Sequence, residues 1–247
     1  MTLSFLFMPA MAWAWGPITH LALGEQLLAV SSTVLPASVY AIIKAFPRDF
    51  LYGSIIPDVV IGKRLQEREA SSHSWKVSRE LFRLARNRPN RAFALGYQAH
   101  LAADTVAHNE YIPRFSHMPR LTHTMLEMKA DSLVHTTIRL EADTVVQMRN
   151  DLLISRALER TRLSFKTNKR LFRGMLKLSG LPRGRQVNGF IDRHLPYPVK
   201  DEEIRHYQEK ALKRMIESLS QGEHAPASRK DPLGWRTRQR SAAFAGR

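Results

Sequence analysis

The sequence predicts an all-α fold, a single multi-helix domain with a helical C-terminal extension. Helical apolar patterns cover most of the chain, and there is no convincing series of strand-like segments and no internal repeat. The 247 residues, 44% of them hydrophobic, suffice for one large domain with a real core. Because the chain has no cysteine, disulfide bonds and thiolate metal sites are excluded, and any metal must use His, Asp, Glu or backbone ligands.

The net charge of +16 predicts attraction to an anionic partner such as nucleic acid, phospholipid headgroups or a bacterial surface polymer. A basic surface that only keeps the protein soluble is the alternative. The charge is uneven: residues 1–43 carry one acidic residue and no Lys or Arg, whereas residues 225–247 carry six basic residues against one Asp.

Residues 1–14 are apolar and end in Ala-Trp-Ala, which fits signal peptidase cleavage before Trp15. No Lys or Arg precedes the apolar run, so the fit is imperfect. Fourteen residues are too short to span a bilayer, which takes about 20 in a helix. We therefore expect a signal peptide over residues 1–14 and a periplasmic or secreted protein.

The first predicted helix begins at Pro17, a residue favoured in the first helical turn, and carries His20 near its start. Cleavage before Trp15 would create an amino group five residues from His20, and an amine with its carbonyl can chelate a metal. Without such company, His20 would be an ordinary helix residue.

The next elements lead to a buried acid and a second histidine. A helix is predicted over residues 37–46, and residues 49–58 predict a short helix or turn that ends at Asp58. Asp58 follows an apolar run, where an unpaired carboxylate would be costly to bury, so we expect it to have a partner. After an exposed loop at residues 63–69, Ser72 is expected to cap a helix that runs to about residue 87.

A helix predicted over residues 89–110 places His100, Asp104 and His108 four residues apart, and we call these three residues the ladder. Each step turns by about 40° and climbs about 6 Å, so the ladder is about 12 Å tall on one helix face. Metal bonds of about 2 Å make it hard for both histidines to share one ion, and a ladder that serves more than one metal is easier to build. The alternative is the polar face of an ordinary amphipathic helix.

A second set of polar residues follows at the same interval in a long helical pattern over residues 120–150. It consists of His123, Glu127, Asp131 and His135. The connection from the first helix is about ten residues, and short connections make antiparallel neighbours, so the two sets can face each other.

Beyond residue 150, helices are predicted over residues 152–163, 169–179 and 201–219. His194 and His206 lack company at ligand spacing and are expected to be structural. The domain plan is therefore a metal-binding catalytic domain over residues 15–150, additional helices packed on it over residues 151–222, and a basic, disordered tail over residues 223–247.

The order of these motifs resembles the zinc-dependent phospholipase C family, whose wider fold includes the single-strand-specific zinc nucleases of fungi and plants. The resemblance covers about residues 15–135. It rests on the ordered set Trp15, His20, Asp58, His73, His100, Asp104, His108, His123 and Glu127. It implies an all-helical domain that holds up to three zinc ions and cleaves phosphodiesters.

The resemblance also implies the ligand sets. A first zinc would be held by Asp58, His73, His100 and Asp104. A second would be held by the amine and carbonyl of Trp15 together with His20 and the shared Asp104, and a third by His108, His123 and Glu127. Asp58 would in addition orient or deprotonate the attacking water. Asp131 would support a zinc-bound histidine, or it would be a simple surface carboxylate.

The expected function is an exported zinc-dependent phosphodiester hydrolase of the phospholipase C type, with a phospholipid or other phosphodiester as substrate. Peripheral membrane contact is compatible with this function, and no obligate protein partner is evident. One alternative is a zinc nuclease of the same fold, for which Tyr97, Tyr111 and Trp75 are the nearby candidates to stack on bases. The other is a non-catalytic, zinc-containing membrane-binding protein.

Overall fold

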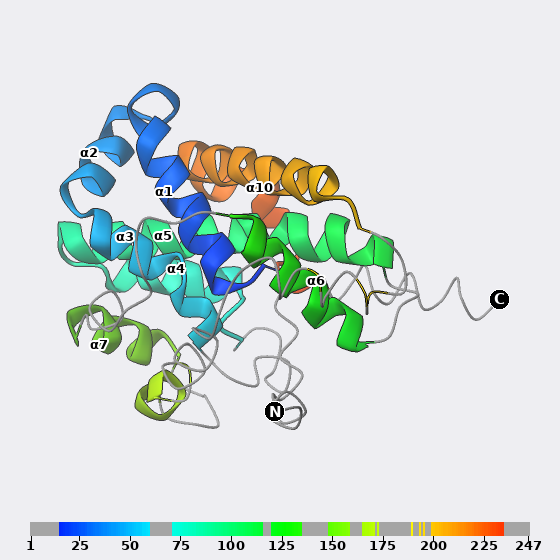
Figure 1. Cartoon of the computed structure of the whole chain (residues 1–247). Helices are drawn as coiled ribbons and strands as arrows, with labels where there is room; N and C mark the ends of the chain where they lie inside the picture. Colours follow the sequence, from blue (N-terminus) through cyan, green and yellow to red (C-terminus); the bar gives the residue numbers. More distant parts are fainter. Residues whose placement is uncertain are drawn as a thin grey trace.

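The computed structural model describes residues 15–59, 71–115, 120–134, 148–158, 165–170, 172, 189, 193, 195 and 199–234. Within these ranges the chain forms helices and no strand, which confirms the all-α prediction (Figure 1). The predicted signal peptide, the loop at residues 63–69, His135, His194, most of the helix predicted over residues 169–179 and the last thirteen residues lie outside the described residues.

The N-terminal third consists of three helices and a short 3-10 turn. They are α1 (Pro17–Val34), α2 (Ala37–Ala45), α3 (Pro47–Gly53) and η2 (Ile56–Val59). Proline occupies the first position of both α1 and α3, where its missing N–H costs nothing and its fixed φ suits a helix.

The helix after His73 is shorter than predicted, and a different serine caps it. α4 spans Trp75–Leu84, and the Oγ of Ser74 accepts a hydrogen bond from the backbone N–H of Lys76 at 3.2 Å. The prediction that Ser72 caps this helix is wrong, because the Ser72 hydroxyl is instead directed to the carbonyl oxygen of Pro57 at 2.9 Å.

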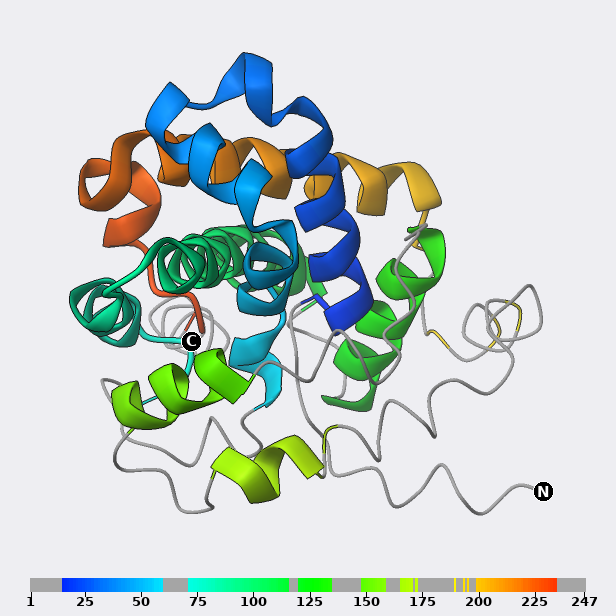
Figure 2. The same cartoon turned by 90° about the vertical axis from the view of Figure 1, so that its left-hand side faces the viewer.

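The ladder lies on the central helix, α5 (Arg88–Val106), which continues into a π-helical turn, η4 (Ala107–Tyr111), and a 3-10 turn, η5 (Ile112–Phe115). Figure 2 looks nearly along α5, which packs against α3 and against α10 (Asp201–Gln221). Most α5 side chains are buried, so the polar ladder is enclosed within the protein.

Two glycines allow α3 and α5 to touch backbone to backbone. A Cβ on Gly96 would lie 1.9 Å from the carbonyl oxygen of Phe50, and one on Gly53 would lie 2.1 Å from that of Phe93. No larger residue fits at either position without moving a helix axis. This close approach brings His100, one turn beyond Gly96, to the end of α3.

The long helix predicted over residues 120–150 is not continuous. α6 spans Arg120–Leu133 and leaves the helical conformation at Val134, and a separate helix, α7, spans Met148–Ala157. Polar contacts dock α7 onto α3: Arg149 makes a bidentate ion pair with buried Asp49 at 2.6 and 2.7 Å, and Asn150 donates to the same carboxylate at 2.7 Å. The helix predicted to begin at residue 152 therefore starts earlier.

The C-terminal region packs on the same core. The side-chain amide of Gln98 on α5 donates to the backbone carbonyl of Ser218 on α10 at 2.7 Å. After α10, the short turns η6 (Gly222–His224) and η7 (Pro226–Arg229) lead to a segment with a buried Leu233. The prediction of disorder is thus wrong for residues 223–234. Among the described helices, none is long and apolar enough to cross a membrane.

Candidate metal centre

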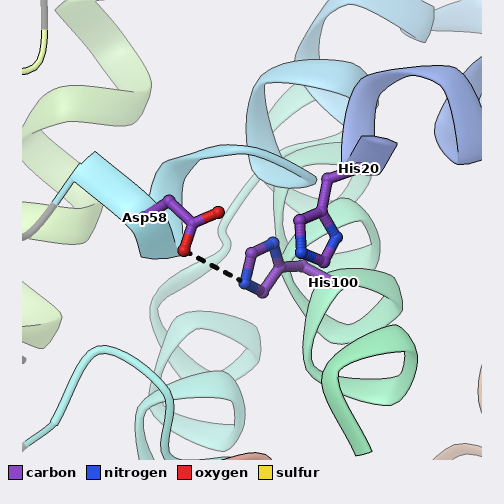
Figure 3. Close-up of side chains that lie close together, drawn as sticks. All are labelled: His20, Asp58 and His100. Atoms are coloured by element: carbon purple, nitrogen blue, oxygen red, sulfur yellow. Dashed lines mark ion pairs between the residues drawn. The ribbon is translucent and has the colours of Figure 1, made fainter. Parts of the chain in front are cut away.

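Four elements place five buried polar side chains around one point. His20 comes from the first turn of α1, Asp58 from η2, His73 from the residues before α4, and His100 and Asp104 from α5. All five are at most 1% exposed. Figure 3 shows His20 and Asp58 meeting His100 from two sides.

Asp104 lies at the middle of this cluster and uses its two oxygens differently. Oδ1 is 3.2 Å from Nε2 of His20, whereas Oδ2 is 3.2 Å from Nε2 of His73 and 3.3 Å from Nε2 of His100. Each oxygen of Asp104 therefore has its own imidazole contacts, although the rings of His20 and His100 also stack on each other with centroids 3.8 Å apart. A carboxylate with different partners at its two oxygens can be shared between two ions.

Asp58 contacts the same two histidines that share Oδ2 of Asp104. Its Oδ1 is 3.3 Å from Nε2 of His73 and 4.0 Å from Nε2 of His100. Two sets of residues each bring their potential ligand atoms within 4.8 Å of one another. One set is His73, His100 and Asp104, and the other is His20, Asp58 and His100. The first set comprises three of the four ligands that the resemblance implies for one zinc, and Asp58 also groups with His20.

Hydrogen bonds on the far side of each ring fix the tautomers of His73 and His100. Nδ1 of His100 is 2.9 Å from the carbonyl oxygen of Ser54, which can only accept, so this nitrogen carries the proton. Nδ1 of His73 is 3.1 Å from the Ser72 hydroxyl, whose own hydrogen is directed to the carbonyl of Pro57, so this Nδ1 also donates. In both rings Nε2 therefore carries no proton and points toward the cluster, as in metal-binding histidines.

The two bare nitrogens face each other at 3.0 Å. Lone pairs at this distance repel unless a proton or cation lies close to both. In addition, neither ring nitrogen of His20 and neither oxygen of Asp104 makes a properly directed hydrogen bond within the part of the chain that the structure describes. Leaving such groups buried without compensation is costly, so the cluster needs a positive charge.

The spacing of the cluster suits zinc. Ligand atoms bound about 2.0–2.1 Å from a tetrahedral zinc lie about 3.3 Å from one another. The contacts of Asp104 with His20, His73 and His100, and of Asp58 with His73, measure 3.2–3.3 Å. The His73–His100 distance of 3.0 Å and the Asp58–His100 distance of 4.0 Å lie on either side of this value. Nitrogen and carboxylate donors without thiolates are also a ligand set that zinc accepts. The residues present therefore fit the metal.

The electrostatics favour a neutral His20 and an ionised Asp104, the forms in which these two side chains bind a metal. Burial and the neighbouring His100 lower the pKa of His20, which favours the neutral ring. Burial alone would raise the pKa of Asp104, but its interactions with His100, and with His20 and His73, outweigh burial and hold this pKa well below its usual value.

The residues implied for a third ion lie on different elements. His108 is buried in the π-helical turn, Glu127 is buried on α6, and neither belongs to the two sets described above. His123 lies on α6, but its side chain is outside the described residues. Trp15 is fully buried with its ring stacked on Tyr111 at 5.0 Å, and burial together with the charges of Glu203 and Glu127 raises the pKa of Tyr111.

Asp131 contacts the first turn of α1. Its Oδ1 accepts hydrogen bonds from the backbone N–H of Thr19 at 2.9 Å and from the Thr19 hydroxyl at 2.7 Å. The carboxylate also lies so close to Gly16 that a Cβ there would be 2.1 Å from Oδ2. Asp131 therefore stabilises the helix N-terminus that carries His20 and packs against the residue after Trp15.

Some contributors to the centre have no local signal in the sequence. Ser54 and Ser72 orient the two histidines, and the Tyr97 hydroxyl donates to the backbone carbonyl of Ser72. Tyr97 and Tyr111 are fully buried, and the half-buried Trp75 uses its indole N–H for the carbonyl of Lys230, so the aromatics expected to stack on bases are engaged in the fold. His206 is exposed on α10, away from this set of ligands.

One of three comparisons with known proteins found a match. No curated protein and no solved structure matches the chain. The profile of the family described as zinc dependent phospholipase C matches residues 19–172, which is more than half of the chain and includes His20, Asp58, His73, His100 and Asp104. The histidine and carboxylate cluster, the all-helical fold and this match together establish that the chain belongs to the zinc-dependent phospholipase C family, a family of phosphodiester hydrolases.

Proposed function

We propose that this protein is an exported phospholipase C-like enzyme that releases the phosphorylated headgroup of a phospholipid. The observation that carries the proposal is that the Nε2 atoms of His73 and His100 carry no proton and lie 3.0 Å apart. Asp104 contacts both of these atoms, and Asp58 contacts that of His73, at 3.2–3.3 Å, which is the spacing of zinc ligands. No serine or cysteine nucleophile is needed.

In this proposal zinc is held by Asp58, His73, His100 and Asp104, and a second ion by Trp15, His20 and Asp104. His108, His123 and Glu127 would hold a third. Bound zinc would lower the pKa of a water and neutralise charge on the phosphodiester. The distinct partners of the two Asp104 oxygens support its role as the shared ligand.

The protein's own groups then perform three tasks. Ser54 and Ser72 keep the proton of each histidine ring on Nδ1, so that Nε2 can bind a metal. Asp58, which lies beside His73, would orient the attacking water and accept its proton. The burial of the ligand side chains lowers the local dielectric, which strengthens their interactions with charge.

Membrane contact is part of the proposal and is supported by an exposed basic face. On α4, the exposed residues Arg79, Phe82 and Arg83 share one side of the helix, and the exposed Arg86 follows just beyond its end. The neighbouring α7 exposes Leu152, at 63%, with Arg156 one turn later. Apolar side chains flanked by arginines suit the interface of an anionic bilayer.

Export rests on residues 1–14. Their apolar run and Ala-Trp-Ala ending support cleavage before Trp15, which would free the amine that the second ion needs. The mature N-terminus, determined by mass spectrometry on protein from an exporting host, tests this step. A mature chain that begins elsewhere would remove Trp15 from the ligand set.

The activity is tested with purified residues 15–247. We expect bound zinc and hydrolysis of phosphatidylcholine vesicles or of a nitrophenyl phosphodiester, and loss of both in Asp104→Asn. A folded protein that binds no zinc and shows no turnover after zinc is added would refute the proposal.

The nuclease alternative has one specific observation in its favour, the exposed arginines of α4 on a chain of net charge +16. Single-stranded DNA offered in competition with phospholipid vesicles separates the two substrates. Phosphate-driven nucleic-acid binding should weaken steeply with salt. The burial of Tyr97 and Tyr111 argues against base stacking at this centre.

A non-catalytic zinc protein is separated from an enzyme by Asp58→Asn. If the protein is an enzyme, this variant should lose turnover even at zinc concentrations that load it as fully as the wild-type protein. If the wild-type protein shows no turnover on any phosphodiester although it is fully loaded with zinc, the binding role is favoured.

A further inference from the structure

We infer that residues 230–234 act as a clasp that positions His108 and the start of α4, so that the C-terminal segment belongs to the metal centre. The clasp lies beyond residue 172, where the family match ends. The inference rests on the proposed zinc site for its consequence, but the clasp itself consists of contacts made by the protein alone.

One end of the clasp holds α4. The indole N–H of Trp75 donates to the backbone carbonyl of Lys230 at 2.8 Å. Trp75 is the first residue of α4 and follows His73 by two positions. The clasp therefore fixes the point at which the chain leaves the cluster around Asp104.

The other end holds the π-helical turn through two side chains. The side-chain amide of Asn109 donates to the backbone carbonyl of Asp231 at 2.8 Å, and Nζ of Lys230 is 3.0 Å from Oε1 of Glu110. Glu110 also pairs with Lys210 on α10. These contacts tie two consecutive residues of the turn to the C-terminal segment.

Gly234 completes the clasp by lying directly on His108. A Cβ on Gly234 would be 2.4 Å from the carbonyl oxygen of His108 and 3.0 Å from its Cβ. Gly234 also has a φ of +63°, a conformation that favours glycine. The segment is packed against the protein at this point, because Leu233 is buried, and its N–H donates to the side chain of Asp231 at 3.1 Å.

The π-helical turn explains why His108 needs such support. A π turn is rare because it is less stable than an α-helix of the same residues, and it frequently occurs at functional sites. Here the clasp touches three residues in a row, His108, Asn109 and Glu110. Without it, the turn would relax toward α-helical geometry and rotate His108 away from its present direction.

The chain offers a matched pair of glycines for the test. Gly222 has a φ of +59°, nearly that of Gly234, but a Cβ there would meet nothing within 4 Å. Gly222→Ala therefore carries the same backbone strain without the contact with His108. Trp75→Phe, which removes only the indole donor, is a milder variant should Gly234→Ala fold poorly.

Two measurements are made on the full-length mature protein. The first is hydrogen exchange of the peptide that covers residues 107–111 with zinc removed; we expect at least tenfold faster exchange in Gly234→Ala and Trp75→Phe, and no change in Gly222→Ala. The second is a zinc titration, in which Gly234→Ala should weaken the binding of one ion by about 10- to 100-fold, as loss of an outer support typically does.

The outcomes are distinguishable. Unchanged exchange at residues 107–111 in both clasp variants overturns the inference, whether or not the protein binds zinc. Equal effects of Gly234→Ala and Gly222→Ala on exchange also overturn it, since strain alone would then be the cause. If the wild-type protein binds no zinc, the proposed function fails, while the exchange data still decide whether the clasp holds the turn.

Discussion

The crossing of α3 and α5 gives a sharp prediction for Gly96→Ala. The new Cβ would lie 1.9 Å from the carbonyl oxygen of Phe50 and 2.9 Å from its carbonyl carbon. A carbon needs about 3.3 Å from a carbonyl oxygen, so the two helices must separate by about 1.4 Å. Because both clashing groups are on the helix backbones, no side-chain rotation can relieve the contact.

The expected cost follows from this geometry. Overpacking typically costs about 1–3 kcal/mol, and a clash between two backbones belongs at the upper end. Alanine is a better helix former than glycine by about 1 kcal/mol, which offsets part of the loss. We expect Gly96→Ala to lower the free energy of unfolding by about 2 kcal/mol.

The metal centre should respond as well, because the same separation pulls His100 away from the carbonyl of Ser54, now 2.9 Å from its Nδ1. A displacement of about 1 Å in a site can cost about 100-fold in rate. Urea unfolding of the metal-free protein measures the stability, and zinc content with phosphodiester turnover measures the centre.

Gly24→Ala on α1 is the control. Its Cβ would meet the ends of two side chains, Leu51 Cδ2 at 2.9 Å and Ser54 Oγ at 3.1 Å, which can move aside. We expect a change in unfolding free energy of less than about 1 kcal/mol. If Gly96→Ala is as stable as Gly24→Ala and keeps its zinc, the close crossing does not position His100 as we argue.

Three further changes test other parts of the centre and its scaffold. Asp104→Asn should weaken zinc binding more than about 100-fold in calorimetric titration; an unchanged affinity would exclude Asp104 as the shared ligand. Asp131→Ala should lower the free energy of unfolding, measured in urea, by about 2 kcal/mol. Thr19→Val should lower it by about 1 kcal/mol, because it removes only one of the two hydrogen bonds to this carboxylate. A larger effect of Thr19→Val than of Asp131→Ala would contradict the capping role of Asp131. Asn150→Leu should cost about 2 kcal/mol because the carboxylate of Asp49 loses a 2.7 Å donor, and a neutral result would show that Arg149 alone docks α7.

The helices could be predicted from the sequence where apolar periodicity and Pro17 mark them, because these are local features. Their ends were less accessible. Ser72 and Ser74 are both good capping residues, and the choice between them depends on the carbonyl of Pro57, fifteen residues away from Ser72. Likewise, the helical pattern after residue 120 does not reveal that α6 stops at Leu133.

The four-residue spacing of polar residues predicted less of the metal centre than did the order in which its ligand residues follow one another along the chain. Four-residue intervals place His100 and Asp104 on one helix face, but only the tertiary fold brings His20 and Asp58 to them. The resemblance supplied that step, and the structure groups these residues although the roles of individual ligands stay predictions. The sequence does not predict that residues 223–234 are ordered, because their composition is polar. They are held by contacts with Trp75, Asn109 and His108, which are more than 100 residues away in the sequence.

The position of α10 has a consequence for how the protein is made. α10 packs along α5 and also contacts α1, so the core joins segments that are about 180 residues apart. Contacts between such distant segments form slowly and only after the intervening chain is available. Residues 201–234, which leave the ribosome well after α1 and α5, therefore close the core around Gln98 and the turn that carries His108. A chain that stopped before α10 would contain the histidines but would lack the packing that holds them in place.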